Sequence, residues 1–255
     1  MEERNNNYTI MEGCTLPSKG LIYDQKVNPN IELRSMTARD EMKRLNPSAT
    51  PLKTLADIIE NCCIEKPAIH VYDMAVGDYE FLLHKLRIVT YGPEYKVSVT
   101  CPYCGEGVDT SAKLDELEVK EFDAEEFEAI RTFTLPVGGQ IVSLKFNTPR
   151  ALDSIENRAK EMKRKAKGAE INFDTYAQML YVIDTVDGKK LSQLDLEYFI
   201  NELPARDMNA IINHSDKLNN YVGLENLLSI TCPKCGEESN TFFRFGPEFF
   251  RPTND

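Results

Sequence analysis

The sequence lacks the patterns that mark membrane and secreted proteins. No apolar run approaches the roughly 18 residues that a membrane-spanning helix needs. The N-terminal stretch, Met-Glu-Glu-Arg-Asn-Asn-Asn, does not show the basic-then-apolar order of a signal peptide. The cysteine count of 7 is odd and fits a secreted disulfide scaffold poorly. We therefore expect a protein without membrane association that is made in a reducing cytosol.

Positive charge is also scarce, with 30 Lys and Arg residues against 41 Asp and Glu residues and a net charge of -11. Nucleic-acid binding rests largely on neutralisation of phosphates by Lys and Arg, so this balance argues against nucleic acid as a partner. One basic run, at 158–167, falls at the end of an expected helix, where cations interact favourably with the helix dipole. It fits a solvated helix end, a docking face for an acidic partner, or a phosphate contact.

Patterns of catalytic residues are missing too. The 3 histidines, His70, His84 and His214, each lie far in sequence from every cysteine and from one another. His84 falls on an expected amphipathic helix, where we expect it to face solvent. The sequence contains neither a glycine-rich phosphate loop ending in Lys-Ser/Thr nor a Gly-x-Ser-x-Gly nucleophile motif. We therefore expect that the protein is not an enzyme.

What the sequence does contain is a repeated cysteine motif. Thr-Cys-Pro-x-Cys-Gly-Glu occurs at 100–106 and again at 231–237, each time after a β-prone run. Two residues between the cysteines allow one tight turn to point both thiolates at a single ion, and the glycine permits the positive φ that closes the turn. Two such turns supply four sulfur ligands, which suits tetrahedral Zn²⁺. The predicted metal ligands are Cys101, Cys104, Cys232 and Cys235.

The two motifs are unusually far apart. Roughly 130 residues separate Cys104 from Cys232, whereas compact four-cysteine sites have about 15–20 residues between their cysteine pairs. The metal would therefore join a C-terminal hairpin to a mid-chain hairpin across a large insertion. Four thiolates leave no open coordination position, which predicts one structural zinc per chain and not a catalytic one. Iron or a pair of disulfides remains an alternative for the same cysteines, and Cys62 and Cys63 are expected to be core or half-buried residues.

Hydrophobic periodicity and turn residues predict a mixture of short strands and helices. A Thr37-to-Asp40 capping box should start the first helix, and Asp78 and Asp174 should cap two later ones. The expected strands are 21–23, 31–36, 116–120, 131–135 and 141–146, besides those that lead into the cysteine motifs. The expected helices are 37–46, 50–66, 78–90, 148–168, 174–186, 192–203 and 204–218.

The order of these elements indicates an α+β fold built as a split zinc ribbon with a helical insertion between its two knuckles. We expect a flexible tail at 1–13, an α+β zinc-ribbon domain formed by 14–147 and 223–255, and a helical insertion subdomain at 148–222. The insertion is bounded by Thr148-Pro149, a typical helix start, and by the return to β-prone sequence after residue 222.

The C-terminal segment is rich in phenylalanine, with five in residues 242–250. Because successive side chains of a strand point to opposite faces, adjacent phenylalanines cannot all pack on one surface. Some of the rings must reach a second surface, which is either the protein's own core or a partner. The candidates for partner binding are Phe243, Phe245, Phe249 and Phe250.

An ordered set of N-terminal motifs resembles the opening of the T4-type phage baseplate hub family. The set comprises Leu-Pro-Ser-Lys-Gly-Leu-Ile-Tyr at 16–23, Ile-Glu-Leu-Arg-Ser-Met-Thr at 31–37, Asp40-Glu41, and the knuckle with Cys101 and Cys104. The resemblance is best over about 14–110. It implies a non-enzymatic hub subunit or hub assembly protein that binds other baseplate and tail proteins. Such a protein is made in the host bacterial cytoplasm and either joins the virion tail baseplate or leaves after assembly.

Two other functions fit the residues alone. A zinc-ribbon nucleic-acid binder or transcription accessory protein would use the basic run at 158–167 against phosphate. An enzyme with a structural zinc would need a nucleophile and a base, and the sequence offers no such pair.

Overall fold

The computed structural model of the chain describes residues 10–166, 171–225, 227–242 and 247–250. The strands are β1 (Met11–Thr15), β2 (Asn30–Arg34), β3 (Glu94–Thr100), β4 (Gly107–Lys113), β5 (Thr132–Thr134), β6 (Ile141–Leu144), β7 (Ile183–Val186), β8 (Leu227–Thr231) and β9 (Glu238–Phe242). The α-helices are α1 (Ala38–Leu45), α2 (Pro51–Cys62), α3 (Val76–Tyr91), α4 (Ala124–Arg131), α5 (Pro149–Lys165), α6 (Phe173–Val182), α7 (Gln193–Glu202) and α8 (Ala205–Tyr221). Three short 3₁₀ segments lie at Val71–Asp73, Leu114–Glu116 and Pro247–Phe250.

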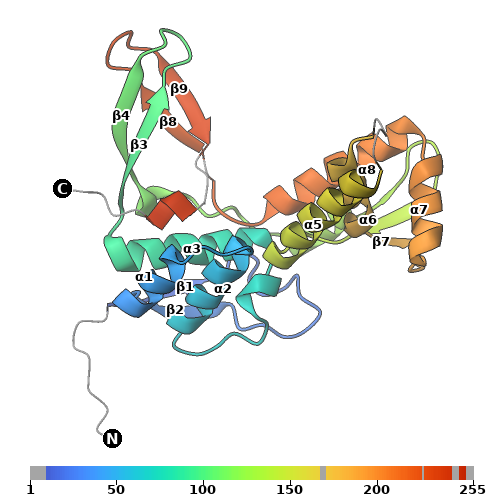
Figure 1. Ribbon diagram of the computed structural model, residues 1–255, viewed down its shortest axis with the longest axis horizontal. Helices are drawn as coiled ribbons and strands as arrows, with labels where there is room; N and C mark the ends of the chain where they lie inside the picture. The colour runs from blue at the N-terminus through green and yellow to red at the C-terminus, as the bar shows by residue number, and fades with distance from the viewer. Residues whose placement is uncertain (1–9, 167–170, 226, 243–246, 251–255) are drawn as a thin grey trace, which may run out of the picture.

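These elements form two lobes and a projecting arm (Figure 1). The first lobe contains the β1–β2 hairpin with α1, α2 and α3. The insertion lobe contains α4 to α8 around the three-stranded antiparallel sheet β5–β6–β7. The arm consists of the hairpins β3–β4 and β8–β9, and it stands on the side of α3 that faces away from α1 and α2. The mixed α+β composition expected from the sequence is confirmed.

The first lobe forms around one apolar core, to which α2 contributes one face and in which α3 is buried over most of its length. Helix α1 begins at the predicted capping box, where the Asp40 backbone N–H donates to Thr37 Oγ1 (3.4 Å) and the Thr37 N–H donates to the Asp40 carboxylate (3.0 Å). Helix α2 begins at Pro51, a position where a missing N–H costs nothing, although the Thr50 side chain does not cap it. The large core beneath these helices includes Cys62 and Cys63, as expected from the sequence.

The N-terminal strand is displaced from its expected position. The structure has no strand at 21–23, which forms a turn, and instead places β1 at Met11–Thr15, partly inside the segment expected as a tail. Strand β1 pairs antiparallel with β2 over its whole length. The turn at 16–23 is fixed from α3, because Asp78 accepts hydrogen bonds from Ser18 Oγ (2.5 Å) and Tyr23 Oη (2.5 Å).

Asp78 therefore does not cap α3 as the sequence predicted. Helix α3 begins two residues earlier, at Val76, and the Asp78 side chain is fully buried against the 16–23 turn. Desolvation by burial raises the pKa of its carboxyl group above the ordinary value. His84 on the same helix is also buried, not solvent-facing, because its Nε2 lies 2.7 Å from the Leu114 carbonyl oxygen at the base of the arm. The hydrophobic periodicity of the helix therefore predicted the wrong face for His84.

The insertion lobe departs from the all-helical expectation. Helix α6 ends at Val182, and Ile183–Val186 form β7, which pairs with β6 where the sequence predicted continued helix. Helix α6 is capped by Asn172 and not by Asp174. The core of this lobe draws on Phe122 to Leu144 as well as on the helices, so packing does not divide at residue 148. The expected strand at 116–120 is reduced to a single bridge between Val119 and Leu224.

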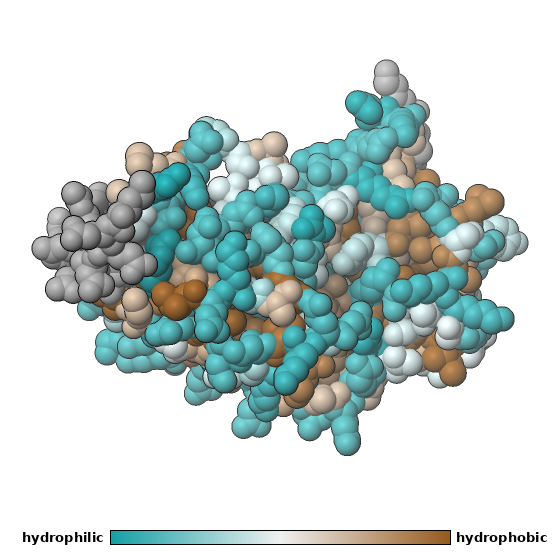
Figure 2. Space-filling model, turned by 90° about the horizontal axis from the view of Figure 1, so that it is seen from below, coloured by the Kyte–Doolittle hydropathy of each residue, from teal (hydrophilic) through white to brown (hydrophobic). Residues whose placement is uncertain are grey.

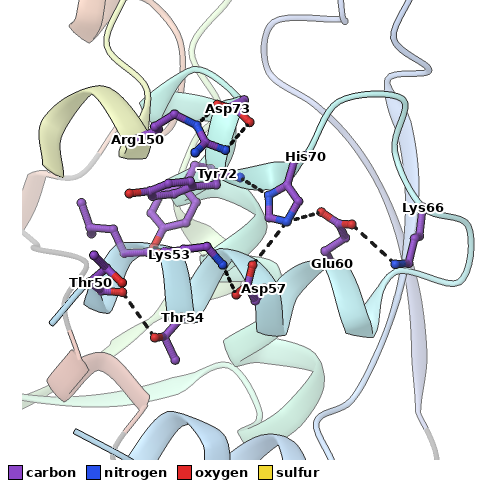
Figure 3. Close-up of polar contacts among 12 residues, drawn as sticks. Thr50, Lys53, Thr54, Asp57, Glu60, Lys66, His70, Tyr72, Asp73 and Arg150 are labelled. Atoms are coloured by element: carbon purple, nitrogen blue, oxygen red, sulfur yellow. Dashed lines mark hydrogen bonds and ion pairs between the residues drawn. The ribbon is translucent and has the colours of Figure 1, made fainter. Parts of the chain in front are cut away.

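The two lobes are joined by polar contacts between the start of α5 and the 3₁₀ turn at 71–73 (Figure 3). The Arg150 guanidinium donates to both carboxylate oxygens of Asp73, at 2.5 and 2.9 Å, and lies 4.5 Å from the ring centroid of Tyr72. The Tyr72 hydroxyl donates to Asp153 at 2.5 Å. In the same view His70 lies 3.3 Å from Asp57 and 3.1 Å from Glu60 of α2.

Helix α3 also passes directly against the chain where it leaves the insertion lobe. A Cβ atom on Gly77 would lie 2.1 Å from the Val222 carbonyl oxygen, so this close approach requires glycine. The lobes are thus connected both by packed backbone and by the Arg150 contacts.

Much of the surface is polar. The face shown in Figure 2 is largely hydrophilic, with a broader apolar area toward the insertion lobe at the right. Exposed apolar residues of that lobe include Leu194 and Tyr198 on α7. Of the described helices, none combines the length and the apolar character needed to cross a bilayer.

Candidate metal centre and the arm that carries it

The arm brings together two hairpins that are distant in sequence. Strands β3 and β4 pair from Glu94–Lys113 to Thr100–Gly107, and the first cysteine motif forms their connecting turn. Strands β8 and β9 pair from Leu227–Phe242 to Thr231–Glu238, with the second motif as their turn. The two turns meet at the end of the arm farthest from α3 (Figure 1).

The two turns have the same hydrogen bonds. Cys101 N–H donates to the Glu106 carbonyl at 2.8 Å, and Gly105 N–H donates to the Cys101 carbonyl at 3.0 Å. The two corresponding bonds of the second turn, from Cys232 and Gly236, are both 2.9 Å. Gly105 and Gly236 have φ values of 72 and 74°, the left-handed conformation that the sequence predicted for them. Local sequence therefore determines the shape of each turn.

All four cysteines point to one place. Their Sγ atoms all lie within 4.8 Å of one another, with Cys101 to Cys235 at 3.8 Å and Cys104 to Cys232 at 3.7 Å. A tetrahedral site with Zn–S bonds of about 2.3 Å requires sulfurs about 3.8 Å apart. A disulfide requires about 2.05 Å. The arrangement fits a four-thiolate metal site, and iron coordinated by four thiolates fits the same donor set.

The surroundings of the cluster act unequally on its thiols, because desolvation and hydrogen bonds among the cysteines outweigh the backbone N–H groups at Cys104 and Cys235 and raise the pKa of both. The backbone N–H groups of Cys235 and Lys234 hydrogen-bond to the Cys232 sulfur and lower the pKa of its thiol to about 7. The Lys234 ammonium also lies 2.5 Å from the Glu106 carboxylate, which links the second turn to the first. Cys101 and Cys232 are buried, whereas Cys104 and Cys235 are exposed at the end of the arm.

The apolar core of the arm is very small. Its buried members are Val108 and Ile230 together with Cys101 and Cys232, and Val99 packs against them. Two of the four buried residues are thus cysteines of the cluster. Without a bond between the sulfurs, few apolar contacts among the described side chains would hold the two hairpins together.

The base of the arm is fixed by Arg87, a residue that no sequence pattern singled out. Arg87 is fully buried in α3 and donates to three carbonyl oxygens, those of Gly92 (2.9 Å), Phe249 (3.2 Å) and Glu94 (3.3 Å). These carbonyls belong to the end of α3, the start of β3 and the C-terminal 3₁₀ turn. A buried arginine on an otherwise apolar helix face has no sequence signature, because its partners are backbone groups.

The expected partner-binding phenylalanines need a correction. Phe249 and Phe250 are 1% and 0% exposed and belong to the core of the first lobe. The ring of Phe249 packs on Tyr95 at 5.5 Å between centroids. Of the two surfaces expected for these rings, Phe249 and Phe250 therefore pack on the protein's own core. Buried rings cannot form a partner surface. Phe243 and Phe245 lie outside the described residues.

The basic run on α5 is largely neutralised in the part that the structure describes. Lys160 and Lys165 pair with glutamates one turn earlier on α5, at 2.5 and 2.6 Å. Lys163 pairs with Asp174 at 2.7 Å, and Arg158 lies 3.4 Å from Glu197. Lys167 lies outside the described residues. This pairing leaves little net positive charge for phosphate contacts.

The third histidine, His214, packs within the insertion lobe. His214 stacks on Phe133 with ring centroids 3.7 Å apart, and its Nδ1 lies 2.9 Å from the Ile130 carbonyl oxygen. Among the described residues, the four cysteines form the one group of potential metal ligands close enough to share an ion.

Fold and cysteine cluster together define a mixed α+β protein whose projecting arm ends in a potential metal site. The model of the family T4 bacteriophage base plate protein matches residues 10–251, which is most of the chain. The chain therefore belongs to this family of phage baseplate structural proteins, and the resemblance of its N-terminal motifs to T4-type baseplate proteins is confirmed. The family implies a location in the virion tail and interaction with other tail or baseplate proteins. Neither the curated proteins nor the solved structures compared with the chain gave a match.

Proposed function

We propose that this protein is a non-enzymatic component of the baseplate hub, acting as a hub subunit or a hub assembly protein through binding to other tail proteins. Membership of the baseplate family carries this proposal. The N-terminal motif set at 16–41, which resembles the hub branch of such proteins, supports the hub role. Synthesis and assembly take place in the host bacterial cytoplasm.

In this proposal one structural Zn²⁺ is bound by Cys101, Cys104, Cys232 and Cys235. The sulfur separations of 3.7 and 3.8 Å support this ligand set. Four thiolates leave no position for water or substrate, so the ion's contribution is to join the two hairpins. It would hold together the chain on either side of the insertion lobe, which neither hairpin could do alone.

Native mass spectrometry tests both parts of the proposal. The purified chain is measured alone and after co-expression with the candidate hub proteins of the same phage genome. The expected result is one zinc per chain and a discrete complex with a hub protein. A complex that persists in mature virions identifies a hub subunit. A complex that is found only before the tail is complete identifies an assembly factor.

Substitution separates the metal from the partner. Cys101→Ser or Cys232→Ser should abolish zinc binding, while Cys14→Ser, at a half-buried cysteine outside the cluster, should retain one zinc per chain. Folded wild-type protein without metal would overturn the zinc assignment. Zinc-loaded protein that binds no hub or tail protein would overturn the hub assignment.

A further inference from the structure

Strand β1 presents an unpaired edge in the described part of the chain. It pairs with β2 on one side and with no described strand on the other. The register is fixed at both ends, because Ser35 N–H donates to the Ile10 carbonyl and Leu16 N–H donates to the Pro29 carbonyl, each at 2.8 Å. In an antiparallel pair, residues whose N–H and C=O groups point toward the partner alternate with residues whose groups point away. The backbone groups of Met11, Gly13 and Thr15 therefore point away from β2.

This edge lacks the features that usually prevent strand pairing. Exposed edges tend to carry lysine, proline or a bulge. The exposed face of β1 carries only Met11, Gly13 and Thr15. The single charged residue of the strand, Glu12, lies on the opposite face, where its carboxylate is 3.3 Å from the Lys85 ammonium of α3. By contrast, β3 has Lys96 on its exposed face, and β4 and β9 likewise expose charged residues.

The sequence of β1 is complementary to itself in antiparallel orientation. With a two-fold axis at Gly13, Met11 lies opposite Thr15 of the second copy and Glu12 lies opposite Cys14. No like charges face each other, and the outward N–H and C=O groups of residues 11, 13 and 15 all find partners. At the axis Gly13 forms a hydrogen-bonded pair with its own counterpart, with Cα atoms about 5.5 Å apart.

The surface beside the edge can receive the one large side chain that projects from it. A hollow of about 1070 Å³ is lined by Gly13, Thr15 and the segments 26–32 and 64–68. Met11 is 58% exposed, and in the two-fold arrangement its counterpart from the second copy lies over Thr15 at the border of this hollow. Methionine adapts readily to irregular apolar gaps.

We infer that β1 is a self-association edge, through which two copies of this chain pair antiparallel across Gly13 to form a continuous sheet. The inference stands apart from the hub role and the metal site, since neither contributes a residue to this edge. Few side chains take part, so the dimer should be weak and its population should depend on protein concentration.

Sedimentation velocity of the full-length, metal-loaded chain across the micromolar range tests the inference. The expected result is a rise with concentration from the 29.0 kDa monomer toward twice that mass. Gly13→Glu places two carboxylates opposite each other at the axis and should weaken the dimer by about tenfold or more. Added salt should recover part of that loss, because the repulsion is screened.

Two controls keep the test specific. A Cβ on Gly13 meets no atom within 4 Å, so Gly13→Ala and Gly13→Glu leave the monomer fold unstrained, and Gly13→Ala should dimerise like the wild type. Val137→Glu adds the same charge at another exposed position and should also leave the dimer intact. Hydrogen exchange should show protection of the amides of residues 11, 13 and 15 only at concentrations where the dimer forms.

Monomeric wild-type protein throughout the range would overturn the inference. So would a dimer that Gly13→Glu leaves unchanged, because that dimer would use another surface.

Discussion

Removal of the metal should unfold the arm and leave both lobes folded. Among the described side chains, burial of Val99, Val108 and Ile230 contributes about 6 kcal/mol to joining the hairpins, at about 2 kcal/mol for each aliphatic side chain. Structural zinc bound by a small domain contributes about 10–16 kcal/mol near neutral pH. Zinc bound by the four cysteines, as proposed, would therefore supply the larger share of the arm's stability. The lobes have separate and much larger cores that contain none of the four cysteines.

Hydrogen exchange followed by mass spectrometry, before and after treatment with a chelator, measures this directly. Peptides from 94–113 and 227–242 should exchange at least about a thousandfold faster without metal, because each 1.4 kcal/mol lost corresponds to about tenfold. Peptides from α3, α5 and α8 should change little. Cys101→Ser should reproduce the effect of the chelator, and Cys14→Ser should not.

Unchanged protection of the arm after complete metal removal would refute this reasoning, since the small apolar core would then suffice. Collapse of protection in all three parts of the molecule would also refute it, because the arm would then be integral to the lobes and not a separate unit.

Three further predictions concern residues that join the parts of the molecule. Gly77→Ala should lower the free energy of unfolding by more than about 3 kcal/mol, since its Cβ would lie 2.1 Å from the Val222 carbonyl oxygen, and denaturant unfolding measures this. Arg87→Met should cost about 3 kcal/mol in the same assay, because three backbone carbonyls lose the donor that the buried Arg87 side chain supplies. Burial lowers the pKa of His84 from 6.5 to about 4, so the unfolded state binds more protons between these values. Stability should therefore fall as pH drops through this window, by up to about 3 kcal/mol, and His84→Gln should remove that component.

Each of these predictions has a matched control or a contradicting result. Gly107→Ala adds a Cβ with no neighbour within 4 Å, and equal stability of the two alanine variants would contradict the close approach at Gly77. Arg39→Met changes an exposed arginine and should be nearly neutral. The histidine effect is read as the difference between wild type and variant, because raised carboxyl pKa values at Asp78 and Glu80 act in the opposite direction. Parallel pH profiles would show that His84 is not buried as a neutral ring.

Helix starts and turns could be predicted from the sequence wherever a few neighbouring residues decide the backbone conformation. The capping box at Thr37 and Asp40 formed where predicted, and the helix expected at 192–203 formed as α7, with Ser192 as its N-cap. These features depend on side-chain-to-backbone hydrogen bonds or on φ preferences within four residues. The shape of each cysteine turn belongs to the same class, and the pair of turns was the strongest indication of a shared site.

Features that depend on long-range packing were not readable in this way. Asp78 and Asp174 were predicted as N-caps. The Asp78 carboxylate instead accepts hydrogen bonds from Ser18 and Tyr23, which lie more than fifty residues earlier in the chain. The helix expected to start at Asp174 is capped by Asn172. Residues 183–186 continue a helical pattern, but pairing with β6 makes them a strand. Propensity is a weak preference that a tertiary partner overrides.

The sequence by itself determined the two cysteine turns, the main helix starts and the membership of the baseplate family that its motifs indicated. Only the tertiary structure decided that the four sulfurs meet, that Arg87 anchors the arm, and that Phe249 and Phe250 lie in the first lobe's core. The physical reason is range: a turn is stabilised by contacts within a few residues, whereas a site formed across an insertion depends on how separate cores pack and orient the segments between them.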